Sequence, residues 1–128
     1  MAVIHIVLFE FKPSAQDTQV AAVRRKKMDE HIASLMQGSQ ACERMLALPT
    51  TCKHPSSGRL YVKSHGGGRN SSTEGLTGGS THGFVFEFEN ESDRDYYVNS
   101  DPDHLAFVGS IGDVVQSARV LDFTPGVL

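Results

Sequence analysis

Two short segments with alternating apolar residues constrain the fold of this chain more than any other feature. Residues 3–12 read VIHIVLFEFK, and residues 82–89 read HGFVFEFE. Both segments are rich in β-branched and aromatic residues, and their period of two sends successive side chains to opposite faces of a strand. The first segment is apolar on both faces through its first half, so we expect that strand to be covered on both sides.

Helical patterns are expected on either side of the second strand. The apolar spacing after the first strand predicts a helix from Ser14 to about Gln37, with Gly38 as its stop. Residues 40–48 fit either a short second helix or a connector that ends at Pro49.

The chain after the second strand is read with the same signals. A helix capped by Asn90 or Ser92 is expected, followed by a second helix from Pro102 that ends at Gly112. The last predicted strand covers residues 114–123 and is stopped by a Thr-Pro-Gly sequence.

The segment 49–80 differs from the rest of the chain in composition, because it holds seven of the twelve glycines. Residues 59–63 (RLYVK) predict a short strand, and we expect the remainder to form a long Gly/Ser-rich insertion of the kind that often lines a binding site. The glycines at 66–68 do not form a phosphate-binding loop, since no GxxxxGK[ST] pattern is present and no amphipathic helix follows directly.

The order of strand, helix, weak strand, strand, helices and strand is typical of a ferredoxin-like α+β fold. The length of 128 residues predicts a single domain over residues 1–128. We expect a four-stranded antiparallel sheet with its helices on one face. The other face then needs a cover, and a homodimer whose two sheets close into an α+β barrel supplies it.

Charge and composition exclude several classes of protein. The net charge is −3, and the one basic run, residues 24–27, is followed by acidic residues, so we expect no nucleic-acid partner. No apolar run approaches the roughly 20 residues that span a bilayer, so no membrane association is expected. Cys42 and Cys52 lack metal-type spacing and predict free thiols in a reducing compartment, and no signal region begins the chain. We therefore expect a cytoplasmic protein.

Three histidines are the candidates for chemistry. His5 and His82 each begin a row that ends in phenylalanines, and they are either satisfied core residues or members of one shared pocket. His104 follows the Asp-Pro break at 101–102, where a neighbouring carboxylate could orient its ring for proton transfer. The alternative is that His104 stabilises the start of its helix or the dimer contact. No HxH or HExxH spacing occurs, so we expect no metal.

Short motifs spread over about residues 3–125 carry a resemblance to a known family. They are His5 in the first strand, residues 68–72 with Glu74, Thr81-His82, residues 95–97, residues 101–104 with Phe107, and residues 121–125. With these motifs the chain resembles the stress-responsive A/B barrel domain (Dabb) proteins of the dimeric α+β barrel superfamily. Within that family it is similar to olivetolic acid cyclase-like proteins.

The resemblance implies a cofactor-independent polyketide cyclase or lyase-type enzyme in which His104 and Tyr97 are catalytic, with Tyr96 as the alternative tyrosine. A tyrosine near the base can donate a hydrogen bond to a carbonyl oxygen as negative charge develops on it. The resemblance and the strand patterns together predict a set of substrate-binding histidine and aromatic residues: His5, His82, Phe9, Phe84, Phe86, Tyr96 and Phe107.

Two functions from different classes follow from these observations. The first is an enzyme without cofactor that acts on a small hydrophobic carbonyl or polyketide-like ligand. The second is a non-catalytic, stress-responsive protein that binds a small ligand in the same cavity. A cofactor-free monooxygenase of the same superfamily is a minor third hypothesis. The activity stays open among these hypotheses because a fold alone does not transfer an activity.

Overall fold

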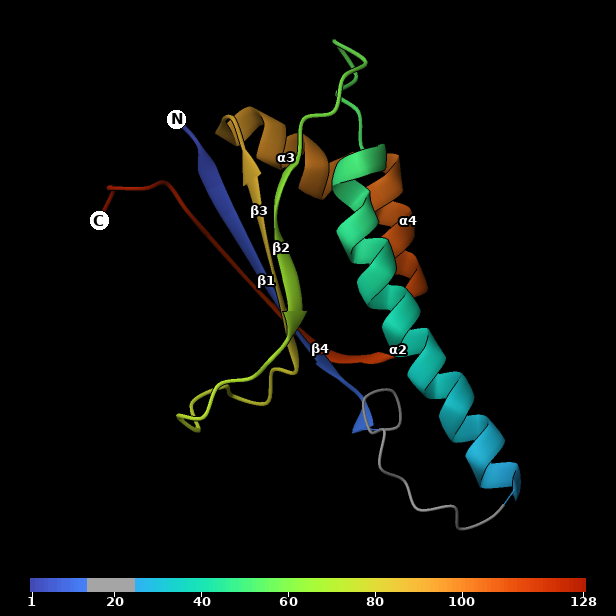
Figure 1. The fold of residues 1–128 in the computed structure, drawn as a ribbon. Helices are drawn as coiled ribbons and strands as arrows, with labels where there is room; N and C mark the ends of the chain where they lie inside the picture. Colours follow the sequence, from blue (N-terminus) through green and yellow to red (C-terminus); the bar gives the residue numbers. More distant parts are fainter. Residues whose placement is uncertain (14–24) are drawn as a thin grey trace.

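The computed structural model describes residues 1–13 and 25–128. In chain order its elements are β1 (Val3–Phe11), α2 (Arg25–Thr51), β2 (Lys63–Arg69), β3 (His82–Phe88), α3 (Glu91–Asn99), α4 (Pro102–Ser110) and β4 (Val115–Phe123). The strands form one sheet in the order β2-β3-β1-β4, and every neighbouring pair is antiparallel. The helices lie together on one side of this sheet (Figure 1). The predicted ferredoxin-like α+β fold is therefore confirmed, while the predicted helix start at Ser14 lies outside the described residues.

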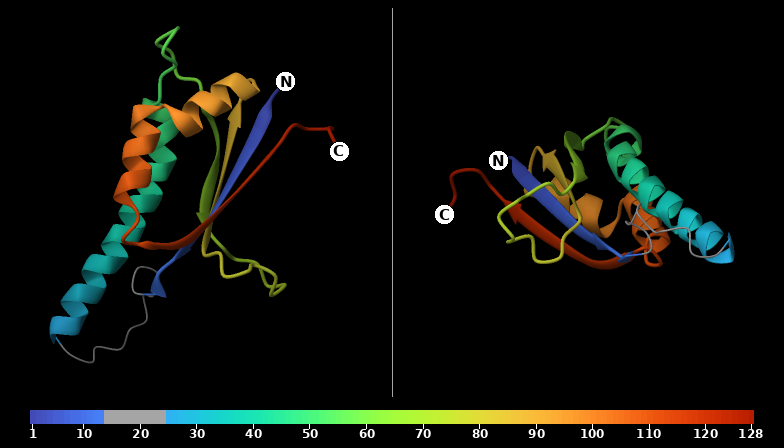
Figure 2. Two further views of the ribbon diagram at one scale, coloured as in Figure 1. Left: turned by 180° about the vertical axis from the view of Figure 1, so that it is seen from behind. Right: turned by 60° about the horizontal axis from the view of Figure 1, so that its bottom comes forward.

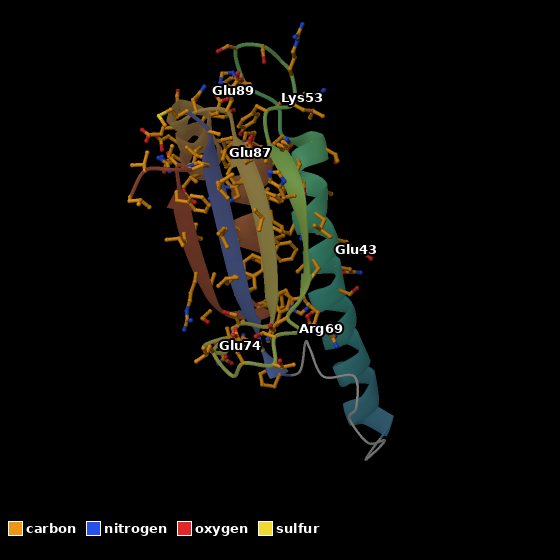
Figure 3. The ribbon with its side chains drawn as sticks, turned by 60° about the vertical axis from the view of Figure 1, so that its left-hand side comes forward. Glu43, Lys53, Arg69, Glu74, Glu87 and Glu89 are labelled. Carbon is orange, nitrogen blue, oxygen red and sulfur yellow. The ribbon has the colours of Figure 1, made fainter. Side chains whose placement is uncertain are left out.

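The alternation of apolar residues separates the two faces of the sheet. On the helix side, β1 and β3 bury a continuous row of side chains, which are Val3, His5, Val7, Phe9, Phe11, Phe84, Phe86 and Phe88. The other face carries Ile4, Ile6 and Leu8, which are half-buried, and Leu121 and Phe123 of β4 are 63% and 44% exposed. Figure 3 looks towards this face, with α3 and α4 behind the sheet. Within one chain, β1 is therefore covered on one side and not on both.

Helix α2 continues through the residue at which we expected it to stop. Gly38 lies inside the helix, and residues 40–48 belong to the same helix and are not a separate element. Ala41, Met45 and Leu48 form one buried stripe at helical spacing on the core side. Their burial outweighs the cost of a mid-helix glycine, which is about 1 kcal/mol. Helix α2 packs alongside α4 in both views of Figure 2.

Strand β2 lies further along the chain than expected, so the predicted strand at 59–63 is wrong except for Lys63. The glycines that we assigned to a loop are part of the strand. Gly66 has φ +94° at a bulge in the pairing with β3, a conformation that favours glycine. A Cβ atom on Gly67 would lie 2.3 Å from Cδ1 of Phe84. Gly67 therefore allows the Phe84 ring to pack against the edge strand.

The starts of α3 and α4 agree with the sequence signals. Asn90 caps α3 by accepting a hydrogen bond from its third residue, and Asp101 caps α4 by accepting from the backbone N–H groups of Asp103 at 2.9 Å and His104 at 3.4 Å. Asp101 is 1% exposed and also accepts from the hydroxyl of Tyr61 at 2.5 Å. The cap places His104 in the first turn of α4.

None of the helices in the described part of the chain has an apolar stretch of the length that crossing a bilayer requires.

Candidate functional site

A cavity of about 500 Å³ lies between the sheet and the helices. Its floor consists of three residue pairs that face each other across β1 and β4, namely His5 with Asp122, Val7 with Val120, and Phe9 with Ala118. Its walls come from the helices and are Met45 of α2, Arg94, Asp95 and Val98 of α3, and His104, Phe107 and Val108 of α4, with Ile111 just beyond. Such a volume is typical of small-molecule sites.

The polar end of the cavity is a chain of charged and hydrogen-bonded groups. His5 Nδ1 lies 2.6 Å from Asp122 Oδ1, and the other carboxylate oxygen, Oδ2, accepts from Arg94 Nη1 at 3.0 Å. Arg94 Nε donates to Asp95 Oδ1 at 2.7 Å. Because an ionised carboxylate can only accept, the His5 proton in this contact lies on Nδ1.

The sheet register creates the pair of His5 and Asp122. These two residues are 117 positions apart in sequence, and the antiparallel pairing of β1 with β4 sets them opposite each other on the helix face. His5 is 3% exposed, and its ring meets Phe88 and Tyr97 edge-on at centroid distances of 5.7 and 5.8 Å. A buried imidazole requires such a partner for its ring nitrogen.

His104 forms the helix side of the same polar end. Its ring lies over the ring of Tyr97 with centroids 4.1 Å apart and an interplanar angle of 31°. Burial, and after it the nearby His5, lowers the pKa of His104 below its usual value. Nδ1 of this ring is buried and has no hydrogen-bond partner among the described residues. The imidazole is therefore neutral near pH 7 and able to accept a proton.

Tyr97 supports His104 from behind and is not one of the residues that line the cavity. Its side chain is completely buried, and its hydroxyl has no partner within the described part of the chain. Burial raises the pKa of this hydroxyl strongly, and the charges of Cys52 and Asp101 raise it further. Tyr97 therefore lies behind His104 and not at the cavity surface, and its catalytic role stays a prediction.

Tyr96, the alternative catalytic tyrosine, does not take the place at the cavity that was expected for Tyr97. Its ring packs against His54 and Tyr61, each at a centroid distance of 5.8 Å, and it does not line the cavity.

His82 lies at the other end of the phenylalanine row. The register pairs His82 with Phe9, whereas His5 pairs with Phe86. His82 Nδ1 lies 2.9 Å from Thr81 Oγ1, and its ring is 4.7 Å from that of Phe11. Burial and then Arg69 lower the pKa of His82. The prediction of a shared pocket for His5 and His82 is wrong, because each histidine lies near the start of its strand and the antiparallel pairing of the two strands places them at opposite ends.

The predicted phenylalanines divide into two groups. Phe9 and Phe107 line the cavity, while Phe84 and Phe86 are buried in the core and are not among its lining residues.

Sequence reasoning missed Asp122 and Arg94 as members of the site. The alternation of Ala118, Val120 and Asp122 in the last strand was the signal that could have placed Asp122 on the helix face. Arg94 carried no such signal in the sequence, and its side chain is 23% exposed and bonds to Asp122.

One group of described residues is close enough to be considered for a metal, and it lies outside the cavity. One ligand atom each of Cys52, Asp101 and Asp103 falls within 4.8 Å of the others. Burial, followed by the charge of Asp101, raises the pKa of Cys52 to about 12, so its thiol keeps the proton that a metal ligand must lose. Asp101 already accepts three hydrogen bonds. The donor set therefore fits a hydrogen-bonded cluster better than a metal site.

The family model of the stress-responsive A/B barrel domain matches residues 3–125, and the chain belongs to this family. Among solved structures, the chain is similar to hydroxynitrile lyase from Passiflora edulis, with 18% identity, coverage of 99% of this chain and 96% of that one, and a TM-score of 0.69. It is also similar to a dabb family protein with a ferredoxin-like fold from Mesorhizobium loti, with 16% identity, coverage of 97% and 96%, and a TM-score of 0.63.

A third similar structure is a dimeric protein of ferredoxin-like fold from Bacteroides fragilis, with 21% identity, coverage of 95% and 94%, and a TM-score of 0.62. At these identities the similarity shows the fold alone. No curated protein matches the chain.

Proposed function

We propose that this chain is a cofactor-independent enzyme of the lyase or cyclase type that takes a proton from a small hydrophobic carbonyl, cyanohydrin or polyketide-like compound, with His104 as the base. The observation that carries the proposal is the position of His104. Its imidazole, with a lowered pKa, lines an apolar cavity of about 500 Å³ beside the pair of His5 and Asp122. A base that is neutral at the working pH and lines an apolar cavity is suited to proton transfer.

Two reactions share this first step. In cyanohydrin cleavage the base takes the hydroxyl proton, the C–C bond to the nitrile breaks, and cyanide leaves with the bonding electrons and takes up the proton. In an aldol cyclisation the base takes a proton from the carbon beside a carbonyl, and the resulting enolate attacks a second carbonyl carbon of the same molecule. The alkoxide formed there takes the proton back from the imidazolium. The similarity in fold to a hydroxynitrile lyase supports the first of these reactions, cyanohydrin cleavage.

The other residues take roles that follow from their places. His5 and Asp122 bind the polar group of the substrate, and Phe9 and Phe107 enclose its apolar part. Tyr97 holds the ring of His104 by stacking and does not donate to the substrate.

A homodimer is part of the proposal. The uncovered sheet face exposes Leu121 and Phe123 beside Ile4 and Ile6, and an apolar face of this kind needs a cover. The dimeric proteins of ferredoxin-like fold among the similar structures support a second copy of this chain as that cover. Light scattering at micromolar concentration tests it, and a stable monomer contradicts it. The free Cys42 and Cys52 support a reducing compartment such as the cytoplasm.

The test uses two probes, the cyanohydrin of benzaldehyde and a short linear triketide thioester. We expect turnover of at least one, and we expect His104→Ala to lower its rate by about 10²–10⁴-fold. His65→Gln is the matched control, because His65 is an exposed histidine on β2 that pairs with Glu87 far from the cavity. Undiminished turnover in His104→Ala contradicts the assignment of the base.

The same cavity also fits a non-catalytic protein that binds a small ligand. Calorimetry with acetophenone, an unreactive carbonyl compound, separates the two functions. Binding that His104→Ala leaves unchanged, with no turnover of either probe by the wild type, favours the binding protein.

A further inference from the structure

Arg94 links two carboxylates that lie on different elements. Its guanidinium donates to Asp122 on β4 through Nη1 at 3.0 Å and to Asp95 on its own helix through Nε at 2.7 Å. The two carboxylates differ in environment, since the side chain of Asp122 is 20% exposed and that of Asp95 is 61% exposed. Both carboxylates line the cavity, but the contact with Asp95 is the more solvent-exposed of the two.

We infer that Arg94 is a positioning residue for the function proposed above: it turns the carboxylate of Asp122 so that His5 keeps its proton on Nδ1 and leaves Nε2 for the substrate. The inference rests on that proposed function for its catalytic meaning. The part of the inference that concerns the tautomer of the His5 ring does not depend on any substrate.

The geometry assigns each oxygen of Asp122 one partner. Oδ2 accepts a hydrogen bond from Nη1 of Arg94, and Oδ1 accepts one from Nδ1 of His5. A carboxylate held at both oxygens cannot rotate, and a charge-assisted hydrogen bond holds it more firmly than a neutral donor does. Without Arg94, Oδ2 has no other partner among the described residues, and the carboxylate is free to turn away from His5.

The state of His5 depends on this contact because a neutral imidazole can carry its proton on either nitrogen. No described residue bonds Nε2, so the fold specifies the tautomer through Nδ1 alone. The titratable groups that face His5 are Asp122 of β4, Tyr97 of α3 and His104 of α4, with Arg94 of α3 behind Asp122. Among them only Asp122 accepts the proton of His5, and Arg94 decides which way Asp122 points.

The experiment compares the wild type with Arg94→Met and Arg94→Lys by nitrogen NMR of the histidine rings, recorded over a pH series that extends until the signals no longer change. The spectrum of His5→Gln identifies the His5 signals. We expect the wild type to show one tautomer, with Nδ1 protonated and Nε2 unprotonated. We expect Arg94→Met to show a mixture of the two tautomers and Arg94→Lys, which keeps a single charged donor, to lie between them.

Two controls separate positioning from general effects. Asp95→Asn weakens the outer contact of Arg94 and leaves the contact with Asp122, so it should keep the wild-type tautomer. Arg59→Met removes an exposed arginine of the loop after α2 and should also change nothing. An unchanged tautomer in Arg94→Met, or a wild type without a proton on Nδ1, overturns the inference.

Turnover gives a second measurement. With the probe that the wild type converts, Arg94→Met should lower kcat by about 10-fold or more while KM changes by less than about 3-fold, because a misplaced group affects the reaction more than binding. Unchanged kcat together with a changed tautomer overturns the catalytic meaning of Arg94. If the wild type converts neither probe while the tautomer responds as expected, the proposed function fails and the positioning of His5 stands.

Discussion

The two ends of the phenylalanine row show how differently the fold uses similar residues. At one end His5 meets a carboxylate, a second histidine and a cavity. At the other end His82 meets the hydroxyl of Thr81 and the ring of Phe11. Both histidines lie near the start of a strand, both face the helices, and each lies beside aromatic rings.

The difference lies in what the sheet places opposite each histidine. His5 is on β1, which pairs with β4, and Asp122 of β4 lies opposite it. His82 is on β3, which pairs with β1 and β2 only, so no residue of β4 lies beside it. Position beside β4 is therefore what separates the histidine that lines the cavity from the histidine that packs at the other end of the row. Substitutions at the two ends test this distinction.

The largest expected effect is on turnover. His5→Gln should lower kcat/KM by about 10²-fold or more, since it removes the group that Asp122 and Arg94 hold in place. His82→Gln should change it by less than about 3-fold, because His82 lies outside the cavity. Steady-state kinetics with the probe that the wild type converts measures both. An equal loss in the two variants would erase the distinction between the ends.

The next effect is on the free energy of unfolding, and it compares a closely packed position, Gly67, with a position at the cavity floor, Ala118. Gly67→Val should lower the free energy of unfolding by about 1–3 kcal/mol, because the new side chain collides with Phe84. Ala118→Val, at the cavity floor, should change it by no more than about 0.5 kcal/mol.

Urea denaturation measures these values. Gly68→Val is the backbone control, since nothing lies within 4 Å of the position its Cβ would take. A Gly68→Val variant as unstable as Gly67→Val would show that strand conformation, and not the contact with Phe84, explains the loss.

A smaller effect concerns the hydroxyl behind His104. Tyr97→Phe should raise the free energy of unfolding by up to about 1 kcal/mol, because it removes a buried hydroxyl without a described partner. Tyr61→Phe is the matched opposite and should lower it by about 1–3 kcal/mol, since Asp101 loses the donor at 2.5 Å. Thermal and urea denaturation compare the two. A large loss of turnover in Tyr97→Phe would return a catalytic role to this hydroxyl.

The smallest effect is a pH dependence of stability, to which a histidine at each end of the phenylalanine row contributes. The pKa values of His104 and His82 are lowered in the folded protein, chiefly by burial, so below about pH 6.5 the unfolded chain takes up protons that the folded chain does not. Stability should therefore fall as the pH drops from about 6.5 towards the folded pKa values, and neither histidine should contribute above that range. Urea denaturation at a series of pH values measures the slope. His82→Gln should reduce it without changing turnover, and an unreduced slope contradicts the shift at His82.

Features that depend on nearby residues were predictable from the sequence. The alternation at 3–12 and 82–89 predicts two strands, and Asn90 and Asp101 cap helices within their own turns. Gly38 was misleading because its local signal for a helix end is weaker than the burial of the stripe that follows it in α2.

Features that depend on register were not predictable in the same way. The pair of His5 and Asp122 exists because β1 and β4 align at one register, and a shift by one residue would send Asp122 to the other face. The glycines of β2 looked like a loop because the contact that requires Gly67, with the ring of Phe84, involves another strand. The sequence alone therefore indicates His104 as a candidate more readily than Asp122 or Arg94.

The buried carboxylate of Asp101 makes the loop after α2 and the helix that carries His104 parts of one cooperative unit. It accepts from Tyr61 at the end of that loop and from the first amides of α4. An opening that detaches Tyr61 weakens the cap of α4, and fraying of α4 leaves the Tyr61 hydroxyl without its acceptor. Amide protons in these two segments should therefore exchange with solvent through a shared opening, even though about 40 residues separate them in the chain.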